Sequence, residues 1–113
     1  MIMQATYKVI ADLIDNVALP PDGTLSRTIH QDDHLKAVLF GFAAGQELSE
    51  HTAATPAIMH FLSGEADVTL GSDPIAAGPG CWIHMPPHTP HSIRAKTSVI
   101  MLLLLLKSGA VQS

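Results

Sequence analysis

Short apolar or alternating runs, separated by glycines and prolines, occupy most of the chain after residue 34. Turn signals such as Gly71-Ser72-Asp73-Pro74 and Gly78-Pro79-Gly80 lie between them. Many short strands with turn residues between them are typical of a β-sandwich or β-barrel. The pattern therefore predicts an all-β fold with strands at Leu35–Ala43, Ile58–Leu62, Asp67–Leu70, Cys81–Met85, His91–Ala95 and Val99–Leu106.

Two segments depart from simple alternation. The run Val99–Leu106 is apolar at every position, which predicts a strand buried on both faces, one against the barrel interior and one against a partner. Near the N-terminus, apolar residues at helical spacing predict a short helix, although Lys8–Ile10 could equally begin a strand. The residues at this spacing are Tyr7, Ile10, Leu13, Ile14 and Val17.

Composition bears on the oligomeric state. The 113 residues are the length of one domain, residues 1–113, and 47% of them are apolar while only 14% are charged. A surface this apolar must be covered by a closed barrel or by a second copy of the chain, so we expect a homodimer. The net charge of −4, with scattered basic residues, predicts no nucleic-acid partner.

Cysteine usage and hydropathy bear on the compartment. The single cysteine, Cys81, can form no internal disulfide and has no adjacent base to activate it. The N-terminal residues are too few and too polar for a signal peptide, and the eight-residue run at Val99–Leu106 is far shorter than the roughly 20 residues of a spanning helix. We therefore expect a cytoplasmic protein with no membrane partner.

Histidines concentrate in the middle of the chain. Five of the seven lie between residues 51 and 91, and neutral imidazole is the commonest metal ligand in proteins. The cluster is therefore a candidate site for a metal or a ligand. Its members are His51, His60, His84, His88 and His91.

Glycines and prolines around two of these histidines resemble the two motifs of small single-domain cupins. His51 lies between Gly45 and Gly64, and the second motif, GCWIHMPPHTPH, holds Gly80, Pro86 and His91 in register. The segment EHTAATPAIMHFLSGEADVTLG resembles a cupin branch whose first motif begins His-Thr-Ala. The resemblance covers about residues 35–106 and implies a double-stranded β-helix, or jelly-roll barrel, with His51 and His91 as metal ligands.

The same resemblance shows where ligands are missing. Ala53 stands where the family usually has its second histidine, and Ala57 stands where it usually has a glutamate. His88 replaces a glycine, and Ala95 replaces an asparagine. Alanine has no donor atom, and zinc-type sites use three or four protein donors.

Other residues are candidates to complete the site. His60 and His84 are the candidate further ligands, and His88 lies on the turn between two strands. Strand alternation places His60 opposite to Ala57, and so away from the barrel interior, unless a bulge near Pro56 shifts the phase. The sequence does not show which face His84 shares with Trp82. The candidate pocket residues are Met59, Phe61, Trp82 and His88.

We therefore expect a small cupin-type barrel that binds a divalent metal, a small organic ligand or both through an atypical set of histidines. Three functions remain open. A divalent metal (Fe, Mn, Ni, Zn or Cu) could support a dioxygenase, isomerase or decarboxylase reaction on a small molecule, as the resemblance implies. The barrel could instead bind a small organic ligand without metal, as a binding or sensor module, which the loss of donors at Ala53 and Ala57 favours. It could also be a structural dimeric barrel without catalysis.

Overall fold

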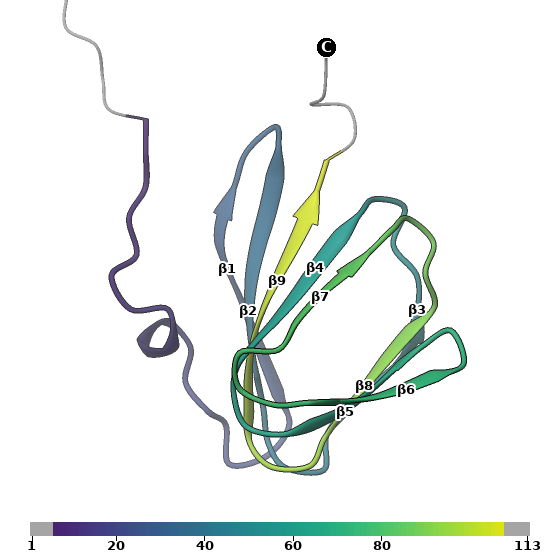
Figure 1. Ribbon diagram of the computed structural model, residues 1–113. Helices are drawn as coiled ribbons and strands as arrows, with labels where there is room; N and C mark the ends of the chain where they lie inside the picture. The colour runs from purple at the N-terminus through teal and green to yellow at the C-terminus, as the bar shows by residue number, and fades with distance from the viewer. Residues whose placement is uncertain (1–5, 108–113) are drawn as a thin grey trace, which may run out of the picture.

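The computed structural model describes residues 6–107, which form two antiparallel β-sheets that face each other (Figure 1). The five-stranded sheet has the order β1-β2-β9-β4-β7, and the four-stranded sheet has the order β3-β8-β5-β6. The all-β jelly-roll prediction is confirmed. The strands are β1 (Thr24–Gln31), β2 (Leu35–Phe42), β3 (Glu47–His51), β4 (Ala57–Ser63), β5 (Ala66–Leu70), β6 (Asp73–Ala77), β7 (Trp82–Met85), β8 (His91–Ala95) and β9 (Val99–Leu106).

The main core fills the space between the two sheets. Alternate residues of each strand point inward, so Met59 and Phe61 of β4 meet Val68 of β5 across the interior. Ala57 also lies in this core and is 2% exposed. The side chains that fill the space between the sheets are therefore apolar, while the outer faces of the two sheets differ from each other.

Strand β9 lies in the middle of the five-stranded sheet, between β2 and β4. Leu102 pairs with Leu39 of β2 and with His60 of β4, and its side chain belongs to a second apolar cluster outside the barrel. Met101, one residue earlier, belongs to the main core. Burial on both faces explains why this strand shows no alternation, as the sequence predicts.

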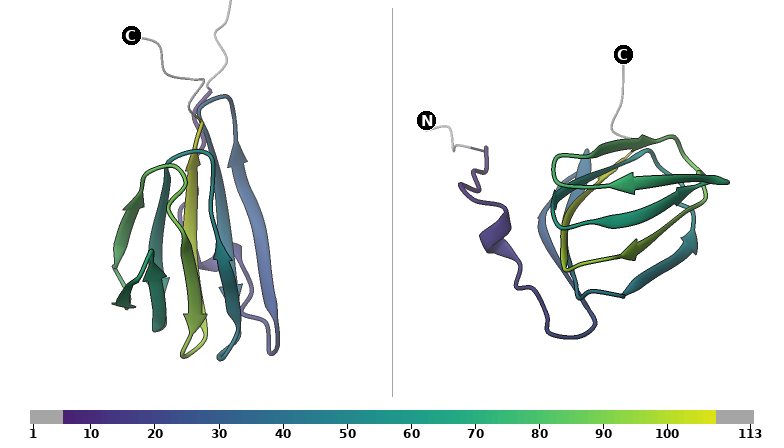
Figure 2. Two further views of the ribbon diagram at one scale, coloured as in Figure 1. Left: turned by 90° about the vertical axis from the view of Figure 1, so that its right-hand side faces the viewer. Right: turned by 60° about the horizontal axis from the view of Figure 1, so that its bottom comes forward.

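The N-terminal segment, residues 6–22, lies alongside the five-stranded sheet, outside the barrel (Figure 2). The prediction of a short helix is wrong, because the structure has only a three-residue 3-10 turn, Ile14–Asn16. Asp12 accepts a hydrogen bond from the Ile14 amide at 3.2 Å, and Asn16 Nδ2 donates to the Asp12 carbonyl at 2.8 Å. Such local hydrogen bonds from Asp and Asn side chains compete with the backbone bonds of an α-helix, so the segment forms only the short 3-10 turn. Within residues 6–107 no helix is long and apolar enough to cross a membrane.

The apolar spacing in this segment packs it against the sheet. Ile10, Leu13 and Val17 all contact the outer cluster around Leu39 and Leu102. The apolar spacing therefore marks the side of the segment that packs on the sheet, although the segment is not a helix.

Gly41 allows the chain to approach the sheet closely. A Cβ added at Gly41 would lie 2.8 Å from the Ala18 carbonyl oxygen. The position therefore has no room for a side chain while the segment lies on the sheet.

Candidate functional site

His51 and His91 lie side by side at one end of the barrel. Strand β3 ends at His51 and strand β8 begins at His91, and the antiparallel register pairs the two residues directly. A register shift between Leu48 and His51 marks an irregularity in β3 just before the pair. The ring centroids are 4.1 Å apart and the rings are tilted by 57°. We call these two residues the histidine pair.

Each imidazole is oriented by a backbone carbonyl two residues earlier in the chain. Nδ1 of His51 lies 2.8 Å from the Ser49 carbonyl oxygen, and Nδ1 of His91 lies 2.9 Å from the Thr89 carbonyl oxygen. A carbonyl oxygen only accepts, so these bonds assign the ring proton to Nδ1 in both residues. Each Nε2 atom therefore carries a free lone pair when the ring is neutral.

The two rings differ in burial. His91 is 6% exposed and is the buried polar side chain of the part of the chain that the structure describes, whereas His51 is exposed. Leu70 of β5 pairs directly with His91, and Leu48 of β3 lies three residues before His51. Both leucines are partly buried and pack against the main core. The pair thus spans the boundary between solvent and an apolar interior.

Two loops are tied together beside the pair. The His88 amide, in the loop between β7 and β8, donates to the Ala53 carbonyl at 2.7 Å in the loop between β3 and β4. His88 has a φ of 66°, the left-handed conformation that glycine favours. Thr89 Oγ1 donates to the Pro86 carbonyl at 2.8 Å in the same turn. His88 contributes its backbone to this connection, and its side chain is exposed.

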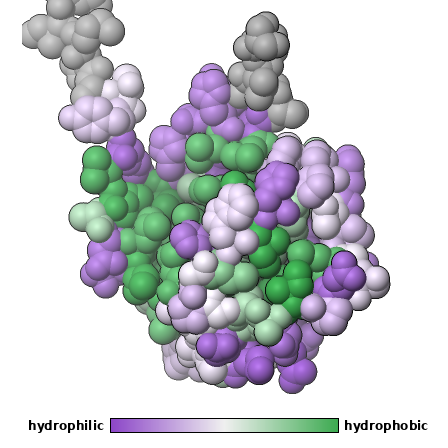
Figure 3. All heavy atoms as spheres, in the orientation of Figure 1, coloured by the Kyte–Doolittle hydropathy of each residue, from purple (hydrophilic) through white to green (hydrophobic). Residues whose placement is uncertain are grey.

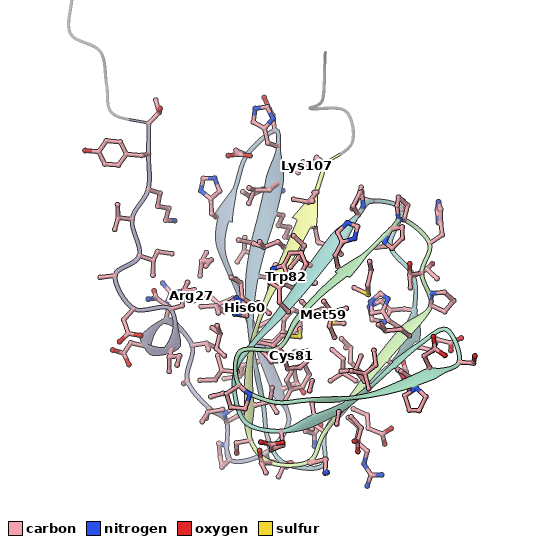
Figure 4. The ribbon with its side chains drawn as sticks, in the orientation of Figure 1. Arg27, Met59, His60, Cys81, Trp82 and Lys107 are labelled. Carbon is pink, nitrogen blue, oxygen red and sulfur yellow. The ribbon has the colours of Figure 1, made fainter. Side chains whose placement is uncertain are left out.

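His60 and His84 do not join the pair. The burial pattern of β4 places His60 on the outer face of the five-stranded sheet, as alternation predicts, and that of β7 places His84 outside with Trp82. Trp82, which is labelled in Figure 4, is 58% exposed. Its ring stacks on that of His84, with ring centroids 6.5 Å apart. The other two candidate pocket residues, Met59 and Phe61, are buried in the main core.

The residues around the pair do not fit a conventional metal centre. Ala57 points into the core and offers no donor, so the pair supplies two imidazole nitrogens. Within residues 6–107 no group of three or more histidine, cysteine, aspartate or glutamate residues is placed to hold an ion. Catalytic zinc-type sites use three protein donors and structural ones use four. The arrangement is suited to accepting hydrogen bonds at two adjacent Nε2 atoms beside an apolar wall.

A separate cavity of about 420 Å³ lies between the N-terminal segment and the turn that joins β1 to β2. Nε2 of His30 lies 2.7 Å from Oδ2 of Asp32 on its rim. This bond, together with the amides of His34 and Leu35, holds the pKa of Asp32 well below its usual range. Sequence reasoning does not reveal this cavity, because one of its walls is the N-terminal segment, which is distant in the chain from the turn. Its lining is Thr6, Tyr7, Lys8, Ile10, Leu13, His30 and Asp32.

Two facing antiparallel sheets enclose an apolar interior and carry a histidine pair at one end, which defines a small jelly-roll β-barrel. The family model described as "Cupin domain" matches residues 38–106. The chain belongs to the cupin family. A search of curated proteins found no match.

Solved structures share this fold. A conserved protein of unknown function from Streptococcus pyogenes, SPY1581, is 31% identical, with a TM-score of 0.80 over 91% of this chain and 90% of that one. A cupin superfamily protein from Desulfitobacterium hafniense is 29% identical, with a TM-score of 0.79 over 83% and 86%. Salicylate 1,2-dioxygenase from Pseudoaminobacter salicylatoxidans, in complex with gentisate, is 15% identical, with a TM-score of 0.71 over 76% of this chain and 25% of that one. At that identity the likeness concerns the fold alone.

Proposed function

We propose that this cupin binds a small organic molecule at the histidine-pair end of its barrel, without a tightly held metal ion. The observation that carries the proposal is the orientation of the pair. Both Nδ1 atoms are occupied by backbone carbonyls, which leaves two Nε2 acceptors next to each other. A ligand that presents two N–H or O–H hydrogens, such as a primary amine, a primary amide or a pair of neighbouring hydroxyls, can donate to both.

The surroundings of the pair favour a ligand with an apolar body. Leu70 pairs directly with His91, Leu48 lies on the same strand as His51, and Met85 lies at the end of β7 that leads into the same loops. Hydrophobic side chains are also visible in the opening beside β7 (Figure 3). Binding sites for small molecules commonly combine apolar walls with a few polar groups that fix orientation. Small aromatic or branched amines, alcohols and phenols with more than one donor hydrogen fit this description.

A metal-dependent enzyme is the competing function. It would require that solvent or substrate supply the donors that Ala53 and Ala57 lack, because the pair provides only two. A site with two protein donors binds divalent ions more weakly than one with three or four. We therefore treat metal binding as an outcome that the experiment must separate from ligand binding.

The first test is a thermal-shift screen of the untagged 113-residue chain against small phenols, diols and amines with an apolar body. A ligand present at 100 times its dissociation constant stabilises the folded state by about 2.7 kcal/mol, so binding is readily detected. The double variant His51→Ala/His91→Ala should lose the shift. The matched control His60→Ala removes a histidine from the outer face and should keep it. A shift that survives in the double variant would show that the ligand binds elsewhere.

The second test measures metal content in the same preparations, made without chelator. We expect no stoichiometric Fe, Mn, Ni, Zn or Cu in the wild type after dialysis against metal-free buffer. One equivalent of metal that is retained by the wild type and lost from the double variant would overturn the metal-free proposal and favour the enzyme hypothesis.

A further inference from the structure

Strand β1 has an irregularity next to the cavity beneath the N-terminal segment. The register between β1 and β2 shifts between Thr28 and His30, which leaves Ile29 as the extra residue of a β-bulge. Ile29 belongs to the outer cluster that the segment covers, and His30 lines the cavity under the same segment. Bulges redirect side chains in this way and are frequent beside functional sites.

Lys8 connects the N-terminal segment to this bulge. Its Nζ atom donates a hydrogen bond to the Ile29 carbonyl, at the place where the bulge interrupts the backbone pairing. An ammonium group has three N–H donors, so two remain for other acceptors. Lys8 lines the cavity, and within residues 6–107 no carboxylate lies within ion-pair distance of its Nζ atom. One wall of the cavity therefore carries a cation with unused donors.

Asp32, the acidic residue on the rim, has its oxygens occupied by its own turn. Oδ2 accepts from His30 Nε2 at 2.7 Å, and Oδ1 accepts from the amides of His34 and Leu35 at 2.7 and 3.0 Å. A second ammonium group lies on the same turn, because Lys107 Nζ donates to the Asp32 carbonyl at 2.5 Å (Figure 4). The negative charge of Asp32 is thus compensated within the turn.

The rest of the lining is largely apolar. Ile10 and Leu13 are half-buried and pack against the outer cluster, and Tyr7 is 80% exposed. The cavity volume of about 420 Å³ falls within the roughly 300–1,000 Å³ of ligand pockets in proteins. Such pockets combine apolar walls with a few polar groups that fix the orientation of the ligand.

We propose that this cavity binds a small organic acid, whose carboxylate accepts hydrogen bonds from Lys8 Nζ and whose apolar body packs against Ile10 and Leu13. A hydrogen bond between two charged groups is among the stronger ones in proteins. Tyr7 adds an aromatic face that is exposed in the free protein and that the ligand would cover. Because the walls come from both the segment and β1, the bound acid would also hold the segment on the sheet.

NMR titration of the 113-residue chain with phenylacetate tests the proposal, with the methyl groups of Ile10 and Leu13 as reporters. Both should shift until saturation, while the methyl groups of Ile93, in the main core, should not. Phenylacetamide has nearly the same shape without the negative charge, so it should bind about tenfold more weakly. The absence of a saturable shift at Ile10 and Leu13, or equal binding of the two compounds, would overturn the proposal.

Two variants separate direct contact by Lys8 from a role in holding the segment. Lys8→Met removes the ammonium group and keeps an unbranched stem, so it should weaken phenylacetate binding about tenfold or more. Arg27→Met removes a second bond between the segment and β1, from Arg27 Nη1 to the Asn16 carbonyl at 3.1 Å, and should leave the affinity nearly unchanged. Equal losses in the two variants would show that Lys8 only holds the segment, which would overturn its assignment to the carboxylate.

The loss of any positive charge must also be distinguished from the loss of this one. Lys96 lies in the loop between β8 and β9 and does not line the cavity. Lys96→Met should therefore bind phenylacetate as the wild type does. The same loss in Lys96→Met as in Lys8→Met would mean that the overall charge of the protein attracts the acid, and would contradict the site.

The histidine pair supplies the last control, because the proposal does not rest on ligand binding there. The pair lies where β3 ends and β8 begins, whereas the cavity lies outside the five-stranded sheet. The double variant His51→Ala/His91→Ala should bind phenylacetate with the affinity of the wild type. Loss of binding in this variant would place the acid at the histidine pair and overturn the proposal.

Discussion

At the scale of single residues, the two members of the histidine pair make the same kind of Nδ1 hydrogen bond but differ in solvent exposure. The resemblance of the glycine and proline spacing to the two cupin motifs singles out His51 and His91 among the seven histidines as site candidates. Alternation along β4 is also enough to place His60 on the outside. The face of His84 could not be predicted, because a four-residue strand acquires its orientation from the strand it pairs with, here β4. The tilt and contact of the two rings likewise depend on the irregular pairing of β3 with β8.

Unequal burial predicts unequal effects on stability. His91→Ala removes a buried ring and leaves the Thr89 carbonyl without its partner, so it should lower the free energy of unfolding by about 1–3 kcal/mol. His51→Ala changes an exposed side chain and should stay within about 0.5 kcal/mol of the wild type. Urea unfolding monitored by circular dichroism measures both. Equal losses in the two variants would contradict the assignment of His91 to the interior.

At the scale of elements, the apolar strands were predictable and the polar ones were not. Strands β1, β3 and β6 have largely exposed side chains, so no hydrophobic period marks them. Strand β6 even begins at Asp73-Pro74, which the sequence marks as a turn. These strands lie next to apolar ones, or at sheet edges, and are held by backbone pairing. Turn positions carry clearer signals, since the glycines that frame the motifs have positive φ where the chain reverses.

Gly64, at the turn between β4 and β5, should be the least replaceable of these glycines. Its φ is +85°, and an added Cβ would lie 2.0 Å from the Ser98 carbonyl oxygen. Gly64→Ala should therefore lower the free energy of unfolding by at least about 3 kcal/mol, from backbone strain and a steric clash together. Gly23 has a φ of +81° and no atom within 4 Å, so Gly23→Ala should cost only about 1 kcal/mol. Thermal or urea unfolding compares the two, and similar losses would show that the contact with Ser98 is unimportant.

The turn between β1 and β2 should respond to acid. The His30 side chain, followed by the amides of His34 and Leu35, lowers the pKa of Asp32 in the folded state. A carboxyl whose pKa is lower in the folded state stabilises the fold above its ordinary pKa, and that stabilisation is lost as the pH falls below it. The stability difference between the wild type and Asp32→Asn should thus be constant above about pH 5 and shrink as the pH is lowered further. Urea unfolding across this range measures the difference, and a pH-independent difference would contradict the role of the ionised carboxylate.

At the scale of the whole molecule, the apolar residues are buried in two places. The apolar excess in the sequence predicts more apolar surface than one barrel interior can take up. The structure distributes that excess between the main core and the outer cluster beneath the N-terminal segment. The extent of the remaining apolar outer face could not be predicted from the sequence, because its side chains come from strands that are distant in the chain and meet only when the sheet forms.

If a second copy covers this face, stability should depend on protein concentration. Binding to the folded state alone stabilises it by mass action, so the melting temperature of the wild type should rise with concentration. Trp82→Glu should melt at one temperature regardless of concentration. Differential scanning calorimetry over a wide concentration range makes this comparison, and a concentration-independent wild type would argue against the dimer.

The central claim is that the Nε2 atoms of the histidine pair hold a small organic ligand. Long-range ¹H–¹⁵N correlation spectra of the histidine rings test it most directly, when recorded during titration with the compound that gives the largest thermal shift. Before addition, His51 and His91 should both carry their proton on Nδ1. The compound should then move the Nε2 signals of these two residues and leave those of His60 and His84 unchanged. Saturation without any change at the pair, or with changes confined to His60 and His84, would contradict the account.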